Sequence, residues 1–336
     1  MKFIDIPEES QRQAINNINM STGLPPSSIE KDWWVTQVLK ALHSLNYSSH
    51  LAFKGGTSLS KCWSLIERFS EDIDICINRE HLGFHGNLSK TQISDKLRRA
   101  ACSFVREHMQ HDVKTALVSQ GINEEAFNVD VLITPVTTTD PEVITVTYRS
   151  IYEHSPYIRN AVKIEISGRA MMEPTRLCPI CSEIDKHFPS SPFSEPAFKV
   201  NAVIPERTFL EKVFLLHEEF CRSEVRIERM SRHIYDLAMM MKTDIADRAI
   251  HDEKLYRDVL EHRRKFIGLK GFNYDELYPA TICIVPKTDI IKLWEKDYEY
   301  MCEHMIYGDA PAFSSMIAQI SQLNDNIRAL DYEIRP

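Results

Sequence analysis

FKGGTSLSKCWSLIERFSEDIDICIN, residues 53–78, ends in two aspartates that alternate with isoleucines. Because successive side chains of a strand point to opposite faces, Asp72 and Asp74 project to one face and Ile73 and Ile75 to the other. At about 3.3 Å of rise per residue, the two carboxylates lie roughly 7 Å apart. Like charges this close repel each other, so a bound cation is the natural compensation. The spacing suits one or two hard divalent ions such as Mg²⁺, which shares its oxygen ligands with phosphates.

A glycine turn precedes these aspartates. Gly55 and Gly56 permit a tight turn with close backbone approach, and Thr57 or Ser58 can cap a helix that starts near Thr57. The free amides at a helix N-terminus bind phosphate. A strand, a glycine turn and a helix, followed by a strand with Asp-x-Asp, therefore predict a phosphate-binding turn beside a metal site.

The composition is that of a globular protein, with 43% apolar and 26% charged residues among 336. The length favours two domains of ordinary size. No run approaches about eighteen apolar residues and the first residues lack a signal-peptide pattern, so we expect a cytoplasmic protein without a membrane partner. Eight cysteines without a framework spacing suit a reducing compartment. The net charge of −8 argues against a DNA-binding protein with a broad basic face but leaves a nucleic-acid substrate open.

Hydrophobic periodicity predicts an α/β (α+β) part followed by a helical part. In the first part, helices are expected at 27–45 and 88–109, and strands at 127–134, 143–150 and 162–169. Ser27 or Ser28 is expected to cap the first of these helices. Residues 173–199 contain five prolines and read as loop. Later helices are expected at 205–220, 230–244, 253–267, 292–306 and 314–330, with one late strand at 281–286. We expect a catalytic domain over 1–199 and a mainly helical domain over 200–336.

The segment FKGGTSLSK…RFSEDIDI resembles the AbiE-type (AbiEii toxin) nucleotidyltransferases of bacterial toxin–antitoxin and abortive-infection systems, within the polymerase-β-like nucleotidyltransferase superfamily. The resemblance implies a nucleotidyltransferase-like mixed sheet with flanking helices, and a C-terminal helical domain that completes the active site. It implies that Asp72 and Asp74 are catalytic and bind Mg²⁺ or Mn²⁺. The residues that it implies for binding the nucleoside triphosphate are Lys54, Gly55, Gly56, Thr57, Ser58, Arg68, Ser70 and Arg207.

Such enzymes add a third carboxylate from a neighbouring strand. Glu165 stands at an alternating position in VKIEISGR and is the first candidate for this catalytic, metal-binding role. Asp130 in FNVDVLI is the alternative. The structural interpretation of Glu165 is an exposed strand residue paired with Lys163 or Arg169.

Two later segments extend the resemblance. PERTFLEK resembles the family's ERT-x-x-EK segment and implies a catalytic Lys212, whose charge can neutralise the β- and γ-phosphates as pyrophosphate leaves. SRHIYDL resembles RHYYDL and implies a catalytic Asp236 that orients Lys212 or contacts the nucleotide, whereas His233 can equally be a buried core histidine. The family's EKD-x-W is matched at 30–34 and its late DY-x-x-M at 297–301, so the likeness extends over most of the chain.

Cys178 and Cys181 form the pair CPIC. A zinc site needs four ligands, and no second pair or histidine cluster stands nearby at a ligand spacing. A thioredoxin-like role needs the pair at the start of a helix that follows a strand, whereas this passage reads as proline-rich loop. We therefore expect neither zinc binding nor redox chemistry from this pair.

The predicted function is metal-dependent transfer of a nucleoside monophosphate from a nucleoside triphosphate to an acceptor hydroxyl, with release of pyrophosphate. By resemblance, the acceptor is the 3′ end of tRNA, toxicity follows from blocked aminoacylation, and a cognate antitoxin is a possible partner. A nucleotidyltransferase that acts on a small molecule or a protein would share every motif named above, because these motifs handle the nucleotide. A non-catalytic binding protein that kept the fold is the remaining alternative.

Overall fold

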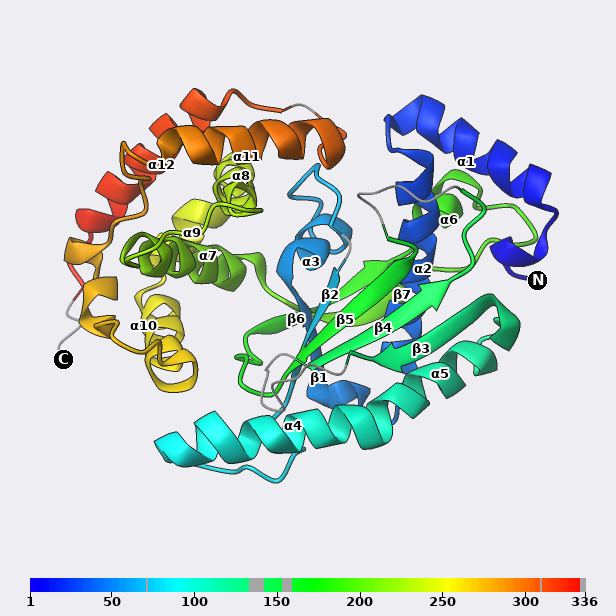
Figure 1. Ribbon diagram of the computed structural model, residues 1–336, viewed down its shortest axis with the longest axis horizontal. Helices are drawn as coiled ribbons and strands as arrows, with labels where there is room; N and C mark the ends of the chain where they lie inside the picture. Colours follow the sequence, from blue (N-terminus) through cyan, green and yellow to red (C-terminus); the bar gives the residue numbers. More distant parts are fainter. Residues whose placement is uncertain (71, 133–141, 153–158, 309, 333–336) are drawn as a thin grey trace. The chain divides into compact units, whose positions relative to one another are not determined.

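The computed structural model describes residues 1–70, 72–132, 142–152, 159–308 and 310–332 (Figure 1). The chain forms two compact units. The first unit comprises Met1–Cys62 and Phe69–Val203, and the second comprises Trp63–Arg68 and Ile204–Pro336. The short segment 63–68 therefore belongs to the second unit, although it lies in sequence between two elements of the first.

Within the described residues, the first unit contains one mixed sheet of seven strands in the order β3-β4-β5-β2-β1-β7-β6. The strands are β1 (Leu51–Lys54), β2 (Asp72–Ile77), β3 (Phe127–Val131), β4 (Glu142–Tyr148), β5 (Ala161–Ser167), β6 (Thr175–Ile180) and β7 (Phe198–Val203). Strand β2 lies between β1, to which it is antiparallel, and β5, to which it is parallel. This mixed sheet with flanking helices confirms the predicted fold class.

The alternation predicted for β2 is present. Ile73 and Ile75 are fully buried, whereas Asp72 and Asp74 on the other face are half-buried. The same period holds in β5, where Ile164 is fully buried. The isoleucine face of the sheet is thus the covered one, and the carboxylate face stays partly open.

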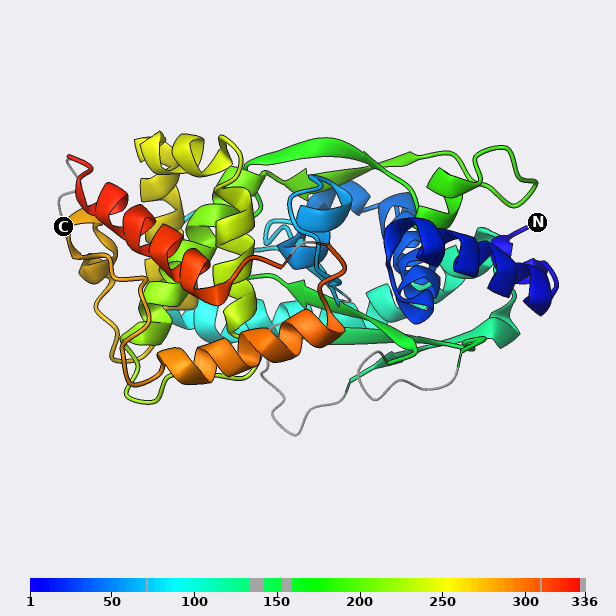
Figure 2. The same cartoon turned by 90° about the horizontal axis from the view of Figure 1, so that it is seen from above.

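The helices of the first unit are α1 (Glu8–Thr22), α2 (Pro26–Ser44), α3 (Gly55–Lys61), α4 (Arg98–Phe104), α5 (Gln110–Ser119) and α6 (Glu183–His187). The π-helical segments η3 (Gln92–Leu97) and η4 (Val105–Met109) join α4 and α5 into one helical run. Helix α2 packs against β5, β7 and α5, and α1 packs against α2 (Figure 2). Thirteen of the nineteen residues of α2 are buried, so it is a core helix.

Three of the differences between predicted and observed helix boundaries lie in the first unit. Helix α2 begins at Pro26 with Pro25 as its N-cap, because proline fits the first helical position, where its missing N–H costs nothing. Helix α3 begins at Gly55, two residues before the expected start, because the left-handed φ of that glycine lets the chain turn directly from β1 into the helix. The helix expected at 88–109 continues to Ser119.

The loop expected at 173–199 was a wrong prediction, because β6, α6 and the start of β7 lie there. Pro179 is part of β6, which is the edge strand of the sheet. A proline lacks an N–H and is tolerated at such an edge, so the prolines did not exclude a strand. The strand expected at 127–134 ends at Val131 as β3, and residues 133 and 134 lie outside the described residues.

The late strand expected at 281–286 is also absent from the described structure. The segment contains the end of the short 3-10 helix η8 (Pro279–Thr281), and no described strand lies beside it. Its backbone amides instead find side-chain partners: Cys283 N donates to His217 Nδ1 at 2.9 Å and Ile284 N donates to Asn324 Oδ1 at 3.0 Å. Because Ile282 and Ile284 are fully buried, apolar alternation here reflects core packing without a sheet.

The described part of the second unit is mainly helical. Its α-helices are α7 (Pro205–Phe220), α8 (Ser231–Met240), α9 (Ile245–His251), α10 (Glu253–His262), α11 (Ile291–His304) and α12 (Phe313–Arg328), with η6 (Arg263–Ile267) and η7 (Tyr274–Leu277) between α10 and α11. Helix α7 packs against α8, α9 and α10, and thirteen of its sixteen residues are buried. Across the described residues, no helix is both long and apolar enough to cross a membrane.

The segment 63–68 is attached to this helical unit by its backbone. Arg68 forms an antiparallel bridge with Ile306. The Glu67 carbonyl accepts from Tyr307 N at 3.1 Å, and Glu67 N donates to the Tyr235 hydroxyl at 3.3 Å. The segment is thus part of the second unit through hydrogen bonds at both Glu67 and Arg68.

Candidate active site

Three carboxylates of the first unit share one face of the sheet; we call Asp72, Asp74 and Glu165 the acidic row. Asp74 on β2 lies directly opposite Glu165 on the parallel neighbour β5. Paired residues of adjacent strands point to the same face, about 4.8 Å apart. Two lysines flank the row, since Lys163 lies opposite Asp72 and Lys54 on β1 lies opposite Asp74.

The acidic row carries more negative charge than its protein neighbours balance. The pKa of the Glu165 carboxyl is raised, first by burial and then by the charges of Asp74 and Asp72. Lys163 and Lys54 oppose the rise but do not cancel it. A positive ion at this face would remove the repulsion that raises the pKa.

The donor set of the acidic row fits hard divalent cations, because all three residues offer carboxylate oxygens. The ligand oxygens of these three described residues do not all lie within 4.8 Å of one another. Two ions about 3.5–4 Å apart spread their ligands more widely than a single ion does. The row therefore fits a pair of Mg²⁺ or Mn²⁺ ions better than one ion held by all three groups.

The alternative third carboxylate lies far from this row. Asp130 is exposed on the edge strand β3, where its carboxylate accepts from Asn128 Nδ2 at 2.6 Å. The sheet order places β4 and β5 between β3 and β2. At about 4.8 Å per strand, Asp130 is roughly 14 Å from the β2 carboxylates, whereas Glu165 is on the adjacent strand.

The glycine turn is packed directly against the acidic row. Gly55 has a φ of +79°, and a Cβ at this position would lie 1.9 Å from Asp74 Oδ2. The Asp74 carboxylate thus occupies the space that any other residue 55 would need. Thr57 Oγ1 donates to the Asp72 carbonyl at 2.5 Å and shares a hydrogen bond with the Ser70 hydroxyl at 3.0 Å. These contacts fix the position of the glycine turn relative to strand β2.

The remaining predicted residues of the turn have different surroundings. Lys54 is the N-cap of α3 and lies in register with Asp74, and Gly56 follows within the first turn of α3. Ser58 is 2% exposed and its hydroxyl contacts the Cys62 thiol. The structure therefore groups Lys54, Gly55, Thr57 and Ser70 with the acidic row, while the Ser58 side chain is directed into the core of the unit.

A second charged group lies inside the helical unit; we call Arg68, Lys212 and Asp236 the buried ion cluster. Asp236 is fully buried on α8. Arg68 donates to both of its oxygens, from Nε at 2.7 Å and from Nη2 at 2.8 Å. Lys212 Nζ on α7 lies 2.8 Å from Asp236 Oδ2 and 3.5 Å from His233 Nδ1. One carboxylate thus joins two cations from segments more than 140 residues apart in sequence.

Burial and charge act in opposite directions on this cluster. Burial would raise the pKa of the Asp236 carboxyl, but the charges of Arg68 and Lys212 outweigh burial and hold that pKa well below its usual value. Burial lowers the pKa of Lys212, and Asp236 opposes this effect. Burial also lowers the pKa of His233 well below its usual value, so the imidazole is neutral at pH 7. Two cations and one carboxylate leave a net charge of +1, which suits an anionic ligand.

Arg207 pairs with a different carboxylate, that of Glu211. Its guanidinium is fully buried on α7 and donates to Glu211 Oε1 from Nε at 3.1 Å and from Nη2 at 3.0 Å. The ERT-x-x-EK segment therefore places Lys212 beside Asp236 and ties Arg207 to Glu211, one turn further along the same helix.

Two of the other motifs fix elements in place. Asp297 on α11 accepts from the amides of Arg229 and Ser231, at 2.6 and 2.9 Å, and so holds the start of α8, which carries Asp236. In the first unit, Glu30 accepts from Ile151 N at 2.9 Å and Lys31 donates to the Arg159 carbonyl at 3.0 Å. These contacts explain EKD-x-W and DY-x-x-M as structural motifs.

The CPIC pair does not form a zinc site with other described residues. Cys178 is buried in β6, and Cys181 follows that strand just before α6. A hydrogen bond between the thiols of Cys62 and Cys178 lowers the pKa of Cys178 and raises that of Cys62. Cys178 thus has its thiol partner outside the motif.

One candidate metal cluster stands apart from both charged groups. Ligand atoms of His217, Cys221 and Glu276 lie within 4.8 Å of one another. His217 Nδ1 accepts from the Cys283 amide, so a neutral imidazole carries its proton on Nε2, the atom that faces Cys221 Sγ at 3.6 Å. Because that proton occupies the only nitrogen directed at the cluster, the arrangement does not suit a metal ion.

Sequence reasoning named Lys163 only as a possible partner of Glu165 and did not place it beside Asp72 on the sheet face. Lys163 stands two residues before Glu165 and opposite Asp72. Of the two lysines that lower the pKa of Glu165, it has the larger effect. The signal was available, because residues two apart in a strand share a face.

Comparison with known proteins gives one family. The model of the family described as "Nucleotidyl transferase AbiEii toxin, Type IV TA system" matches residues 37–319. No curated protein matches the sequence closely enough to count as a relative. Among solved structures, the chain is similar to MenT4, a nucleotidyltransferase toxin from Mycobacterium tuberculosis H37Rv, with 16% identity and a TM-score of 0.46 over 95% of this chain and 99% of that chain. At these values the structural likeness supports no inference about substrate or mechanism.

Proposed function

Because the chain belongs to the AbiEii nucleotidyl transferase toxin family of type IV toxin–antitoxin systems, we propose that it transfers a nucleoside monophosphate from a nucleoside triphosphate to a hydroxyl of tRNA. Nucleotidyl transfer and the toxin role follow from family membership. The divalent metal, the residues that act and the acceptor are the proposal. The observation that carries it is the acidic row, three carboxylates on one face of two adjacent strands, where burial and the charges of Asp74 and Asp72 raise the pKa of Glu165.

Asp72, Asp74 and Glu165 would hold two divalent cations, Mg²⁺ or Mn²⁺, through their carboxylate oxygens. When bound, such ions neutralise the triphosphate and lower the pKa of the attacking hydroxyl. Lys54 and Lys163, on either side of the row, limit the negative charge that the incoming triphosphate meets. The Gly55 backbone packs against the Asp74 carboxylate and so restricts the position of that carboxylate.

The transfer breaks one bond and forms one. The acceptor oxygen bonds to the α-phosphorus, the bond from that phosphorus to the β-bridging oxygen breaks, and pyrophosphate leaves in line. The hydroxyl loses its proton in the same step. We assign the role of accepting that proton to Glu165, the carboxylate that β5 adds to the row opposite Asp74.

The helical unit would supply the cationic groups for the triphosphate. Lys212, which is held by Asp236 in a cluster of net charge +1, can interact with the β- and γ-phosphates as pyrophosphate leaves. Arg68 stands only four residues before Asp72 in the chain, and it donates one hydrogen bond to each carboxylate oxygen of Asp236. We therefore assign Arg68 to orienting Asp236, and Asp236 to orienting Lys212. In this proposal the helical domain completes the active site.

The acceptor is proposed by resemblance to the toxin family. A nucleotide added to the 3′ end of tRNA blocks aminoacylation, which accounts for a toxic effect. Such an acceptor is met in the cytoplasm, where we expect the protein to act. A type IV system also implies a cognate antitoxin.

The test is transfer of a labelled nucleoside triphosphate to bulk tRNA with Mg²⁺, comparing the wild type with Asp74→Ala. We expect label on the tRNA 3′ end from the wild type and at least a ~10³-fold loss in the variant, since a metal ligand stabilises charge in the transition state. Each of the four nucleotides is supplied in turn.

Parallel reactions with an aminoglycoside and with total protein separate the acceptor from the chemistry. Label on either of these and none on tRNA would keep nucleotidyl transfer and reject the tRNA acceptor. A wild type that labels no acceptor with any of the four nucleotides would reject the enzyme and leave a binding protein that kept the fold.

A further inference from the structure

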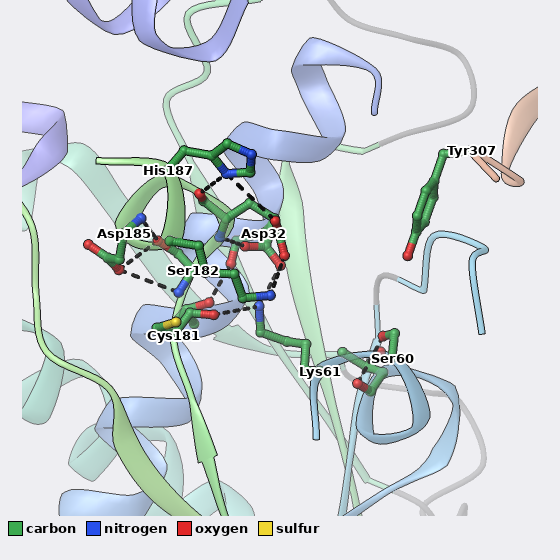
Figure 3. Close-up of polar contacts among 12 residues, drawn as sticks. Asp32, Ser60, Lys61, Cys181, Ser182, Asp185, His187 and Tyr307 are labelled. Atoms are coloured by element: carbon green, nitrogen blue, oxygen red, sulfur yellow. Dashed lines mark hydrogen bonds and ion pairs between the residues drawn. The ribbon is translucent and has the colours of Figure 1, made fainter. Parts of the chain in front are cut away.

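A second ion pair of the first unit lies at the far end of α3, the helix that begins at the glycine turn. Lys61, the last residue of α3, places Nζ 2.5 Å from Asp32 Oδ1 (Figure 3). The exposed fractions of the two side chains are 7% and 16%. The Lys61 ammonium also donates to the Cys181 carbonyl at 3.5 Å. The end of α3 is therefore held by charged contacts in a largely buried place.

Asp32 joins three segments through one carboxylate. Its Oδ2 accepts from Glu183 N, at the first residue of α6, at 2.8 Å, while Oδ1 binds Lys61. Asp32 itself lies on the core helix α2. Figure 3 shows these contacts converging on one point, between the end of α3 and the start of α6. Helix α2 thus acts as the fixed support for the end of α3.

A buried ion pair is weak grounds for a stabilising role. Removing two charges from water costs several kcal/mol, and their attraction repays this cost only with good geometry and further hydrogen bonds. Apolar side chains of similar size often stabilise such a site as well or better. The ion pair between Asp32 and Lys61 fixes the position of one helix end relative to another, and apolar contacts do this less well.

The opposite end of α3 touches the acidic row. Gly55 packs against the Asp74 carboxylate, and Thr57 donates to the Asp72 carbonyl. The helix has seven residues and is about 10 Å long. A helix this short moves as a rigid body, so a shift of its last residue is transmitted to the turn that contacts both aspartates.

We propose that Asp32 and Lys61 are positioning residues of the nucleotidyl-transfer site. Their ion pair holds α3 so that the glycine turn keeps the carboxylates of Asp72 and Asp74 where two divalent cations can bind. The proposal rests on the proposed function of the acidic row. Neither residue touches nucleotide, acceptor or metal, and their effect passes through Gly55 and Thr57.

The test measures Mn²⁺ binding to the whole chain without nucleotide, by the electron paramagnetic resonance signal of the free ion. Lys61→Met and the double variant Asp32→Asn/Lys61→Met should bind Mn²⁺ at least about tenfold more weakly than the wild type, as residues that orient metal ligands do. The double variant removes both charges and leaves no unpaired buried ion, so it separates a loss of Mn²⁺ affinity from a loss of fold. Lys61→Arg restores the charge and should recover most of the affinity.

Lys40→Met is the matched control. Lys40 is also on α2 and pairs with Glu195 at 3.1 Å, away from α3, so its loss should leave Mn²⁺ affinity unchanged. A folded double variant with wild-type Mn²⁺ affinity would overturn the positioning role. Failure of the proposed function gives a different result. In that case either the wild type and Asp74→Asn bind Mn²⁺ equally, or the wild type labels no acceptor.

Discussion

The acidic row and the buried ion cluster solve the problem of buried charge in opposite ways. In the row, three carboxylates face two lysines, and burial together with the charges of Asp74 and Asp72 raises the pKa of Glu165. In the cluster, one carboxylate receives hydrogen bonds from two cations and keeps its charge although it is fully buried. In our proposal the row is completed by divalent cations, whereas the cluster pairs its charges within the protein. Substitutions should therefore separate function from stability in the row and affect both in the cluster.

The largest effect on stability is expected from Asp236→Asn. The substitution leaves Arg68 and Lys212 buried without their carboxylate, which costs about 3–5 kcal/mol of unfolding free energy. Because the pKa of Asp236 is lowered in the folded protein, its stabilising effect is fully present at neutral pH. The effect fades only as the pH falls below about 4, the pKa of an aspartate in the unfolded chain. Chemical denaturation between pH 5 and 8 should therefore show a constant difference from the wild type.

Asp258→Asn is the control for this measurement. Asp258 pairs with Lys254 on the exposed side of α10, where solvent screens the pair, so Asp258→Asn should leave the unfolding free energy almost unchanged. If Asp236→Asn and Asp258→Asn lower the unfolding free energy by the same amount, the buried ion cluster does not have the stabilising role that we assign to it.

A second substitution links the turn to the row. Gly55→Ala forces a Cβ onto the Asp74 carboxylate at a positive φ, so the turn or the carboxylate must shift. We expect about a 10²-fold loss of nucleotidyl transfer, the effect of displacing a reacting group by about 1 Å. Gly83→Ala is the matched control, because Gly83 has a similar φ of +84° and no atom within 4 Å of the added Cβ. Both variants bear the cost of a left-handed residue, about 1–2 kcal/mol, and only Gly55→Ala should lose transfer. Equal activities would show that the contact with Asp74 is not needed.

The smallest change in stability is expected from Glu165→Gln, and its sign is opposite to that of the Asp236 variant. Because the pKa of Glu165 is raised in the folded protein, folding loses stability as the pH rises from the usual glutamate pKa, about 4.3, through the folded value. At pH 7 without metal, the glutamine variant should melt at a higher temperature than the wild type, and the difference should vanish below about pH 4. Mn²⁺ should raise the Tm of the wild type more than that of the variant.

Asp130→Asn tests the alternative third carboxylate, by thermal melting and by the rate of nucleotidyl transfer. Asp130 is exposed on the edge strand, so its substitution should change neither the Tm nor the transfer rate. A loss of transfer in Asp130→Asn, with full transfer in Glu165→Gln, would exchange the roles of the two residues.

The acidic row was accessible from sequence because its signal is local. The alternation of Asp72 and Asp74 with isoleucines predicts a strand with one polar face, and the structure has that strand. The same logic identifies Glu165 on its strand. The register that places Glu165 beside Asp74 is not local, because it depends on a parallel pairing across about ninety residues of chain.

The buried ion cluster was predicted from sequence only in part, because the resemblance implied that Asp236 orients Lys212 but did not connect Arg68 with either residue. Nothing near Arg68 signals a partner 168 residues later, and the guanidinium was predicted to bind the nucleotide. The edge strand β6 was missed for a different reason, since Pro179 reads as a strand breaker unless the strand is known to lie at an edge. Contacts distant in sequence and positions in the sheet are the parts that only the folded chain supplies.

The assignment of residues 63–68 to the helical unit has a consequence for how this protein can change by recombination. The chain passes from one unit to the other after Cys62, after Arg68 and after Val203, so no single crossover in the gene exchanges one complete unit for that of a relative. A chimaera joined at residue 203 would combine Ile66, Glu67 and Arg68 of one parent with Tyr235, Asp236 and Tyr307 of another. The two halves of the gene are therefore expected to be inherited together, with the six-residue segment as the reason.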